Sequence, residues 1–533
     1  MRIFIFLLFL FLVSCNAEVV ENEKVDSMAE NHYGEEHRPQ FHFSPPAKWM
    51  NDPNGMVYYD GEYHLFYQHY PDSTVWGPMH WGHAVSKDMV SWENLPIALY
   101  PDSLGYIFSG SAVVDAKNTS GLKNGTEDPI IAIFTYHNPE GAKAGSNTYQ
   151  YQGIAYSNDR GRTWTKYEGN PVVENPGIRD FRDPKVFWHE SSGKWVMIFA
   201  AKDRVRLYSS PNLIDWTFNS EFGAEWGDHG GVWECPDLFE LKLQGMEKSR
   251  WVMLLSINPG GPNGGSATQY FVGDFDGETF TLDPYFQSDL GGPGSEKAKW
   301  VDYGRDNYAG VTWSDIPAVD GRRLFLGWMS NWNYANVVPT ETWRSAMTIP
   351  RELVLVERND VFLLLSKPVM ELDKLRGEAF TLEQTMLEAQ MDLTSQLDFS
   401  PAMSEVILEI EIPEGETPNF GVELGNSNGE VYRIGYDAAK NEYYSDRTKA
   451  GKRSFSDAFA GKMHIAPRLI DGQTVRMHLY FDVASAELFA DSGATVLTDI
   501  FFPNEDFNQL RLFSENGQVA LKSAKVYALN AIW

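Results

Sequence analysis

Residues 195–200 read WVMIFA, and this short apolar stretch decides the fold together with four others like it. The others are residues 63–68 (YHLFYQ), 130–136 (IIAIFTY), 251–257 (WVMLLSI) and 324–329 (LFLGWM), which follow one another at intervals of 56 to 73 residues. Several come directly after turn-forming residues such as Asp60-Gly61 or Asp320-Gly321, so each reads as the second strand of a β-hairpin. Repeated all-strand units predict a β-propeller, here with five blades over residues 39–366.

A second repeat follows the first and supports the same fold. Residues 86–92 (SKDMVSW), 157–164 (SNDRGRTW) and 209–216 (SSPNLIDW) share a plan of Ser, a polar turn and Trp after a strand, and residues 273–280 (GDFDGETF) are a looser copy. A large β-sandwich or a β-helix is the alternative, but parallel β-helices repeat on a much shorter period. The repeats therefore favour five blades.

Beyond residue 353 the repeat stops and a different pattern begins. Residues 367–377 (KPVMELDKLRG) read as a linker with a short helical turn. Apolar and polar residues then alternate with period two in residues 405–412 (EVILEIEI), 475–481 (VRMHLYF) and 509–513 (QLRLF). This pattern predicts a C-terminal antiparallel β-sandwich over residues 378–533, so the expected fold class is all-β: a five-bladed β-propeller followed by a β-sandwich.

The first residues of the chain read as an export signal. Residues 1–15 (MRIFIFLLFLFLVSC) combine Arg2 with an apolar run that is too short to span a bilayer as a helix. Residues 12–15 resemble a bacterial lipobox, which predicts lipidation of Cys15; an ordinary cleaved signal is the alternative. Residues 16–38 are polar and acidic and are expected to form a flexible tether. The protein is thus expected to be lipid-anchored in the bacterial cell envelope, at the outer membrane, with a periplasmic or secreted location as alternatives.

Composition narrows the partners of the protein. The 533 residues carry a formal net charge of −29, which disfavours nucleic acid and anionic membrane surfaces but not a neutral ligand. Aromatic residues make up 14% of the chain and include 17 Trp, so an aromatic binding surface is expected. Of the two cysteines, Cys235 has no partner for a disulfide once Cys15 is assigned to the signal, and it is expected to be a small packing residue.

Each propeller unit opens with a cluster of polar residues. The clusters are residues 49–55 (WMNDPNG), 108–111 (FSGS), 181–184 (FRDP), 233–237 (WECPD) and 302–306 (DYGRD). The first strand of every blade lines the central axis of a propeller, so these groups are expected to converge around one funnel. Carboxylates in an aromatic-lined pocket favour glycoside chemistry, in which one carboxyl group stays ionised and another holds a proton for the leaving oxygen. Trp49, Trp76, Trp81, Trp233 and Trp328 are the expected stacking surfaces for sugar rings.

Three of these clusters resemble the defining motifs of glycoside hydrolase family 32. They are WMNDPNG at residues 49–55, FRDP at 181–184 and ECP at 234–236, and residues 76–83, 302–309 and 343–353 match further. Asn307, where relatives often carry an aromatic residue, is a minor departure. The family contains β-fructosidases such as invertases, inulinases and levanases, and it pairs a five-bladed propeller with a β-sandwich, so the resemblance covers about residues 38–533.

The resemblance implies a division of roles among three acids. Asp52 is the expected nucleophile on the anomeric C2 of a fructofuranosyl unit, Glu234 the general acid/base, and Asp183 the stabiliser of the transition state. Arg182 and Asn51 are expected to hold the geometry of the site. The expected sugar contacts are Gln68, Trp76, Phe108, Ser109, Asp306 and Trp328.

The expected reaction is release of fructose from levan, inulin, fructo-oligosaccharides or sucrose by double displacement. No cofactor and no metal ion are expected, since the His residues show no HExxH spacing and His80 and His83 read as packing or hydrogen-bonding residues. Alternatives that the sequence leaves open are an endo-acting levanase or inulinase, a transferase, an inverting hydrolase of arabinose or xylose chains, and a non-catalytic fructan-binding protein. The preferred substrate and the oligomeric state also stay open.

Overall fold

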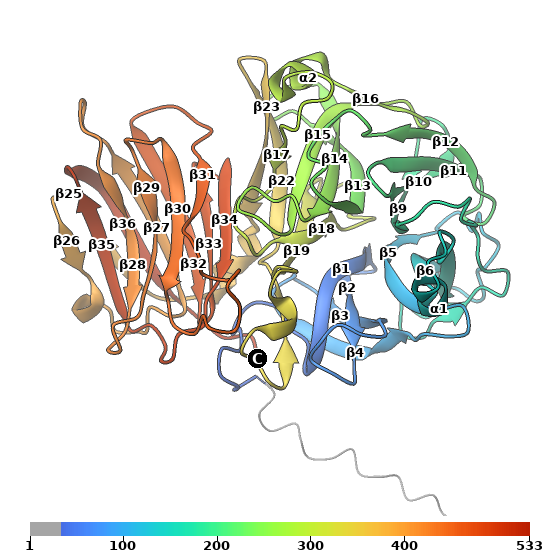
Figure 1. Cartoon of the computed structure of the whole chain (residues 1–533), viewed down its shortest axis with the longest axis horizontal. Coiled ribbons are helices and arrows are strands. Elements are labelled where there is room, and N and C mark those ends of the chain that lie inside the picture. Colours follow the sequence, from blue (N-terminus) through green and yellow to red (C-terminus); the bar gives the residue numbers. More distant parts are fainter. Residues whose placement is uncertain (1–32) are drawn as a thin grey trace, which may run out of the picture.

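The computed structural model describes residues 33–533, which form a ring of β-sheets with a β-sandwich beside it (Figure 1). The predicted signal peptide, Cys15 and residues 16–32 of the predicted tether lie outside the described residues. None of the helices in the described part has the length and apolar character needed to cross a membrane.

Five sheets of the ring are the predicted blades, and each contains four consecutive antiparallel strands or their equivalents. Blade one is β1 (Lys48–Tyr59), β2 (Glu62–Tyr70), β3 (His80–Ser86) and β4 (Trp92–Leu99). Blade two is β5 (Tyr106–Val114), β6 (Ile130–His137), β7 (Gln150–Ser157) and β8 (Thr165–Lys166). Blade three is β9 (Phe181–His189), β10 (Lys194–Ala201), β11 (Val205–Ser210) and β12 (Thr217–Phe222). Blade four is β13 (Val232–Lys242), β14 (Ser249–Asn258), β15 (Ala267–Phe275) and β16 (Phe280–Leu282), with β17 (Lys299–Trp300) paired to β15. Blade five is β18 (Tyr308–Thr312), β19 (Arg323–Met329), β22 (Arg351–Arg358) and β23 (Val361–Pro368), with β21 (Ala346–Met347) paired to β19.

The five apolar stretches of the sequence occupy equivalent places in these sheets. They form β2, β6, β10, β14 and β19, and each is hydrogen-bonded to the first strand of its blade. The first strands contact one another in the order β1, β5, β9, β13 and β18, and β18 contacts β1, so the ring closes. A short strand, β20 (Trp343–Arg344), pairs in parallel with the start of β1. The predicted propeller is therefore confirmed.

The second sequence repeat forms one turn in three blades, between the third and fourth strands. In blade one, Asp88 accepts hydrogen bonds from the backbone N–H groups of Val90 and Ser91, and Trp92 Nε1 donates to Met89 O at 3.1 Å. Trp164 and Trp216 donate to backbone oxygens three residues earlier in the same way. Each of these Trp side chains thus stabilises the turn of its own blade by a hydrogen bond and is not a stacking surface for a sugar.

The C-terminal part is the predicted antiparallel sandwich of two sheets. One sheet has the order β24 (Arg376–Leu382), β36 (Val519–Leu529), β27 (Ser404–Glu411), β32 (Thr474–Asp482), β33 (Ser485–Ala490) and β34 (Thr495–Ile500), with β25 (Thr385–Leu387) paired to β36. The other has the order β26 (Gln390–Asp392), β35 (Gln509–Glu515), β28 (Asn419–Gly425), β29 (Val431–Asp437), β30 (Glu442–Lys449) and β31 (His464–Pro467). The inner faces bury one apolar core that includes Phe420, Tyr432, Leu479 and Leu512.

Helices are short and lie in connections. They are α1 (Pro139–Lys143), α2 (Pro284–Leu290) and the 3₁₀ helices η1 (Ala335–Val337), η2 (Met370–Leu375) and η3 (Thr394–Gln396). Helix η2 lies within the predicted linker of residues 367–377, and β24 begins at Arg376, inside that linker, because it already pairs with β36.

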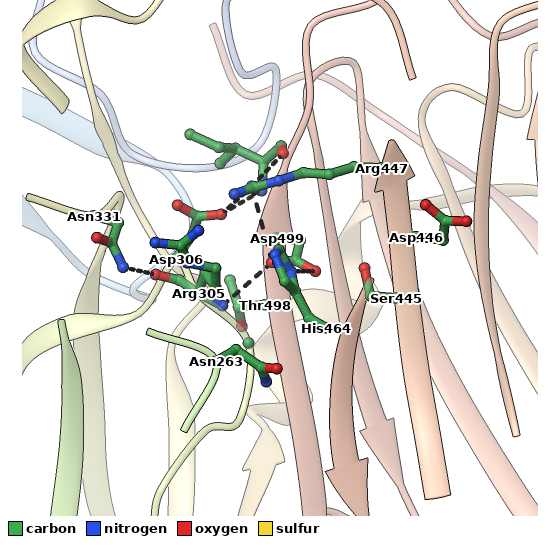
Figure 2. Close-up of polar contacts among 12 residues, drawn as sticks. Asn263, Arg305, Asp306, Asn331, Ser445, Asp446, Arg447, His464, Thr498 and Asp499 are labelled. Carbon is green, nitrogen blue, oxygen red and sulfur yellow. Dashed lines mark hydrogen bonds and ion pairs between the residues drawn. The ribbon is translucent and has the colours of Figure 1, made fainter. Parts of the chain in front are cut away.

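The propeller and the sandwich are joined by buried ion pairs (Figure 2). Arg447 of β30 donates to Asp306 Oδ2 at 2.6 Å and to Tyr334 Oη at 2.8 Å, and all three side chains are fully buried. Arg351 of β22 likewise donates to Asp302 Oδ2 at 2.9 Å and to Glu487 of β33. Asp302 and Asp306 therefore belong to the seam between the two domains.

The last residues of the predicted tether are part of the folded body, so the predicted boundary at residue 38 is wrong. Arg38 is fully buried and its guanidinium donates to Glu35, Ser44 and two backbone carbonyls. Tyr33 stacks on Trp533 with ring centroids 3.9 Å apart. A buried guanidinium with a full set of acceptors holds this segment against the protein, which its polar composition did not indicate.

Candidate active site

Four of the five first strands break their pairing within their polar cluster, and in blade five the break follows the cluster, at the start of β18. The register with the second strand shifts between Asn51 and Pro53, between Ile107 and Gly110, between Arg182 and Lys185, between Glu234 and Asp237, and between Tyr308 and Val311. Residues in such bulges leave the ladder and their side chains are re-aimed. Pro53, Pro184 and Pro236 suit these places because proline has no N–H to give to the ladder.

The bulges turn the site residues into one pocket of about 290 Å³. Its lining comes from four of the five blades and from the loop after β19: Asn51, Asp52, Gln68, Trp76, Phe108, Ser109, His137, Tyr149, Gln150, Asp180, Arg182, Asp183, Glu234 and Trp332. Asp52, Asp183 and Glu234, which stand far apart in the sequence, thus face the same cavity. They do not lie on opposite sides of the molecule, an arrangement that would have excluded joint chemistry.

Asp52 is held by two donors and one weak contact. Ser109 Oγ donates to its Oδ2 at 2.7 Å and Asn51 Nδ2 donates to its Oδ1 at 2.9 Å. Cys235 Sγ lies 3.7 Å from Oδ2. Burial, followed by the nearby charge of Glu234, raises the pKa of Asp52, whereas the two hydrogen bonds lower it. The donors fix the direction in which a carboxylate oxygen points into the pocket.

Asp183 lies in a strained backbone conformation. Its φ is 65°, in the left-handed region that is uncommon for residues other than glycine, and its backbone N–H donates to Thr135 Oγ1 at 3.0 Å. Its Oδ2 accepts from the backbone N–H of Cys235 at 3.1 Å. Burial raises the pKa of Asp183 to about 7, with Arg182 opposing this and Glu234 and Asp52 adding to it.

Both carboxyl oxygens of Glu234 accept hydrogen bonds. Arg182 donates to Oε1 through Nη2 at 2.6 Å and through Nε at 3.2 Å, and Tyr308 of blade five donates its hydroxyl to Oε2. Burial and the charge of Glu234 raise the pKa of the Tyr308 hydroxyl well above its usual range, so it stays a donor. The carboxyl group therefore has a defined orientation towards the cavity.

The charge balance of the pocket favours retention of a proton. Arg182 is the single guanidinium of the lining, and its Nη1 is also bonded to Asp180 at 2.7 Å. Four carboxyl groups, those of Asp52, Asp180, Asp183 and Glu234, lie around it. Since like charges at close range resist joint ionisation, these carboxyl groups raise one another's pKa, and the pKa values of Asp52 and Asp183 are both raised.

Aromatic and amide groups complete the pocket. Trp76 is 39% exposed at the rim and meets Phe108 edge to face at 6.1 Å between ring centroids. Trp332 stacks on the buried Trp49 at 5.8 Å. Gln68 is buried, and its Nε2 has no hydrogen-bond partner among the described residues. A donor without an acceptor in a polar pocket suits a hydroxyl group of a ligand.

Two predicted sugar contacts lie elsewhere. Asp306 does not line the pocket, because both of its oxygens are taken by Tyr334, Arg447 and the backbone N–H of Ile500 at the domain seam. Trp328 is fully buried behind the pocket wall, where it packs on Trp332 at 4.9 Å. Both predictions were therefore wrong about position: Asp306 supports the domain seam and Trp328 supports the wall.

Sequence reasoning missed several residues of the site: His137, Tyr149, Gln150, Asp180, Tyr308 and Trp332. Asp180 could have been found from the sequence, since it stands two residues before Arg182 of the bulged strand β9. Cys235 is buried as expected, with its Sγ 3.7 Å from Asp52 Oδ2 and its backbone N–H on Asp183. Burial, followed by the three surrounding carboxylates, raises the pKa of its thiol well above the usual range, so it is no nucleophile.

Within residues 33–533, no cluster of three or more His, Cys, Asp and Glu side chains has the arrangement to hold a metal ion.

A five-bladed propeller whose pocket combines the carboxyl groups of Asp52, Asp183 and Glu234 with aromatic walls is the arrangement of a glycosyl hydrolase. The chain belongs to glycosyl hydrolase family 32: the model of the family's N-terminal domain matches residues 42–368, and the model of its C-terminal domain matches residues 371–528.

Individual relatives agree with this assignment. A levanase of Bacillus subtilis (strain 168) is 48% identical over 510 residues, which are 95% of this chain and 72% of the relative. The crystal structure of exo-inulinase from Aspergillus awamori superposes with a TM-score of 0.85 at 36% identity, covering 94% of this chain and 100% of that one. A β-fructofuranosidase from Schwanniomyces occidentalis, complexed with fructosyl-erythritol, gives a TM-score of 0.83 at 32% identity, covering 93% and 98%.

Proposed function

We propose that this protein releases fructose from β-fructofuranosides, including levan, inulin and shorter fructo-oligosaccharides, by double displacement. The observation that carries the proposal is that Asp52 and Glu234 line one pocket together with Asp183. Ser109 and Asn51 direct the first carboxyl group, and Arg182 and Tyr308 direct the second. The similar proteins named levanase and exo-inulinase support the substrate class.

The first half of the reaction transfers the fructosyl unit to the enzyme. An oxygen of Asp52 forms a bond to the anomeric C2 while the bond from C2 to the leaving oxygen breaks, and Glu234 gives its proton to that oxygen. Positive charge builds on the ring during this step. Asp183, beside the ring, stabilises it by accepting hydrogen bonds that strengthen as the charge develops.

The second half returns the enzyme to its starting state. Glu234, now ionised, removes a proton from water, and the water oxygen bonds to C2 as the bond to Asp52 breaks. Two inversions at C2 leave the product with the configuration of the substrate. Fructose departs, Asp52 is again a carboxylate and Glu234 again carries its proton.

We infer that the enzyme acts from chain ends. The pocket is lined by residues of four blades and of the loop after β19 and holds only about 290 Å³, which suits a terminal fructosyl unit better than the middle of a polymer. The exposed Trp76 at its rim is placed to meet the next unit. Early digestion of levan and inulin should release free fructose; a ladder of oligosaccharides as the first products would contradict this.

Two variants test the catalytic assignment. Asp52→Asn and Glu234→Gln should each abolish fructose release while thermal unfolding stays close to that of the parent. Glu247→Gln, at a carboxyl group whose side chain is 98% exposed outside the pocket, is the matched control and should keep full activity. NMR of the first-formed fructose should show the β anomer. Undiminished turnover in Asp52→Asn, or an inverted first product, would refute the mechanism.

We further propose that the protein is exported and anchored by a lipid on Cys15. The support is the charged, apolar and lipobox-like order of residues 1–15, together with relatives named as extracellular enzymes. In cells, Cys15→Ser should move the enzyme from the membrane fraction to the soluble fraction without altering its activity on sucrose. Membrane association that persists in the variant would contradict the anchor.

A further inference from the structure

The propeller has a second cavity at the other end of its inner strands. Asp183 of β9 and Glu234 of β13 face the active site, whereas residues 187–189 and 238–240 of the same strands line a basin of about 610 Å³. At about 3.3 Å per strand residue, Phe187 lies roughly 13 Å along the strand from Asp183. The volume is within the range of about 300–1,000 Å³ that is usual for ligand pockets.

A buried polar plug separates the two cavities. Lys185 of β9 pairs with Asp237 of β13 at 3.3 Å, and Asp237 accepts from both the N–H and the hydroxyl of Thr312 at 2.7 Å. Lys185 also donates to the carbonyl oxygen of Thr312. The basin is therefore a site of its own and not an extension of the catalytic pocket.

The basin contains donors and acceptors that the protein leaves unused. The Arg323 guanidinium lies 4.8 Å over the ring of Phe239, and it has no hydrogen bond or ion pair with any described residue. Asp315 uses Oδ2 to accept from the backbone N–H of Val114 at 2.8 Å, which leaves its other oxygen for a ligand. A partly exposed guanidinium that neither hydrogen-bonds nor ion-pairs with the described residues keeps its N–H donors available to a ligand, with the charges of Asp237 and Asp315 nearby.

Aromatic rings form one wall of the basin. Phe187, Trp251 and Phe275 are in mutual contact, with centroids 5.1 to 6.2 Å apart, and His189 joins the cluster. Trp251 and Phe187 are only partly buried. Such rings offer apolar faces on which the C–H faces of sugar rings pack.

The charge of the basin selects among ligands. Its two cationic side chains, Lys185 and Arg323, are outnumbered by the carboxyl groups around them, those of Asp237, Asp315, Glu190 and Glu240. A free anion would meet net negative charge here, and the whole chain carries −29. A neutral ligand that both donates and accepts hydrogen bonds fits this mixture.

We propose that the basin is a second, non-catalytic binding site for a neutral oligosaccharide, with its rings against Trp251 and Phe187 and its hydroxyl groups on Arg323 and Asp315. The choice of a fructan chain as ligand rests on the proposed function. Because the plug closes the axis, a chain held here would not enter the catalytic pocket of the same molecule from below. The site would instead keep the enzyme on the polymer that it degrades.

The experiment counts binding sites. Calorimetric titration of the Glu234→Gln variant with an inulin-type tetrasaccharide should show two sites, and addition of Arg323→Met should reduce the number to one. Methionine keeps an apolar side chain over Phe239 but removes the donors. The matched control is Arg206→Met, which removes a guanidinium that lies 4.6 Å over Phe218 outside the basin and should leave two sites.

Kinetics separate this site from the catalytic one. With Glu234 intact, Arg323→Met should leave kcat/KM for sucrose unchanged and raise the apparent KM for polymeric fructan. Asp315→Asn, which keeps the acceptor for Val114, is the second variant and should act in the same direction should Arg323→Met fold poorly. The proposal would be overturned by a single tetrasaccharide-binding site in every protein, or by two sites that persist in both Arg323→Met and Asp315→Asn. Tighter binding of inorganic phosphate than of the tetrasaccharide would also overturn it. If the parent released no fructose, the proposed function would be refuted, whereas the number of binding sites in the titration would still test the second site.

Discussion

Raising the pH above neutrality should weaken the folded protein through one histidine at the domain seam. His42 lies between two carboxylates of the sandwich, with Nδ1 2.8 Å from Asp482 Oδ2 and Nε2 2.9 Å from Glu487 Oε1. All three side chains are fully buried. Burial lowers the pKa of His42, but the hydrogen bonds and charges of the two carboxylates outweigh this and raise it from 6.5 to about 9.

The sign and size follow from that shift. A group whose pKa is raised in the folded state contributes stability that is fully present below its unfolded pKa, here 6.5, and is lost as the pH rises through about 9. At about 1.36 kcal/mol per pKa unit, the loss is about 3 kcal/mol. Above pH 9 the neutral imidazole can donate to only one carboxylate; where that is Asp482, Glu487 keeps only Arg351 and the backbone N–H of Ile349.

Urea unfolding of the parent and of His42→Gln at pH 6, 7.5 and 9.5 measures this contribution. The free energy of unfolding should differ most between the two proteins at pH 6, and the difference should shrink by about 3 kcal/mol at pH 9.5. His64→Gln is the matched control, because burial lowers the pKa of His64 to about 4 and its charge does not change in this window. A difference between parent and His42→Gln that is constant from pH 6 to 9.5 would refute the reasoning.

Three further substitutions have defined outcomes. Tyr308→Phe removes a hydrogen bond of about 1.5–3 kcal/mol to the Glu234 carboxyl group. Steady-state kinetics should therefore show kcat reduced roughly 10- to 100-fold with little change in KM, and a kcat equal to that of the parent would contradict this role. Arg447→Met leaves Asp306 buried without its cation, and urea unfolding should register a loss of about 3–5 kcal/mol, whereas a neutral effect would show that the seam tolerates an unpaired carboxylate. Trp332→Ala removes an aromatic wall worth about 1 kcal/mol of stacking, so KM for sucrose should rise roughly five-fold, and an unchanged KM would place the sugar elsewhere.

Local patterns in the sequence were sufficient to predict the propeller. The second strand of each blade is buried on both faces, so it appears as a nearly continuous apolar run, and residues 195–200 in β10 are an example. The clusters before these strands contain proline beside an acid, which marks the bulges at Asp52, Asp183 and Glu234. The spacing of the apolar strands and the positions of the turn residues are local properties of the sequence. Once they indicate a closed ring of blades, the three acids are expected to converge at its axis.

Contacts between distant segments were beyond that reasoning. Asp306 stands in an acidic cluster like those of the other blades, but its partner Arg447 lies 141 residues later in another domain. Trp328 lies on β19, the second strand of blade five, and is fully buried there. Trp332, four residues on, leaves the strand and reaches the pocket. No spacing in the sequence distinguishes these two tryptophans until the end of β19 is known.

The connection between the sandwich and the active site runs through one short segment. Asp302 and Asp306 are bound by Arg351, Thr498 and Arg447 at the seam, and Tyr308, two residues after Asp306, donates to Glu234. The start of β18 is thus held from the sandwich side while its first residue, Tyr308, orients the Glu234 carboxyl group. A side chain positions a proton only as well as its own backbone is held, and the backbone before Tyr308 is held largely by the second domain. Packing of the sandwich against the propeller and placement of Glu234 therefore depend on the same seven residues, 302–308.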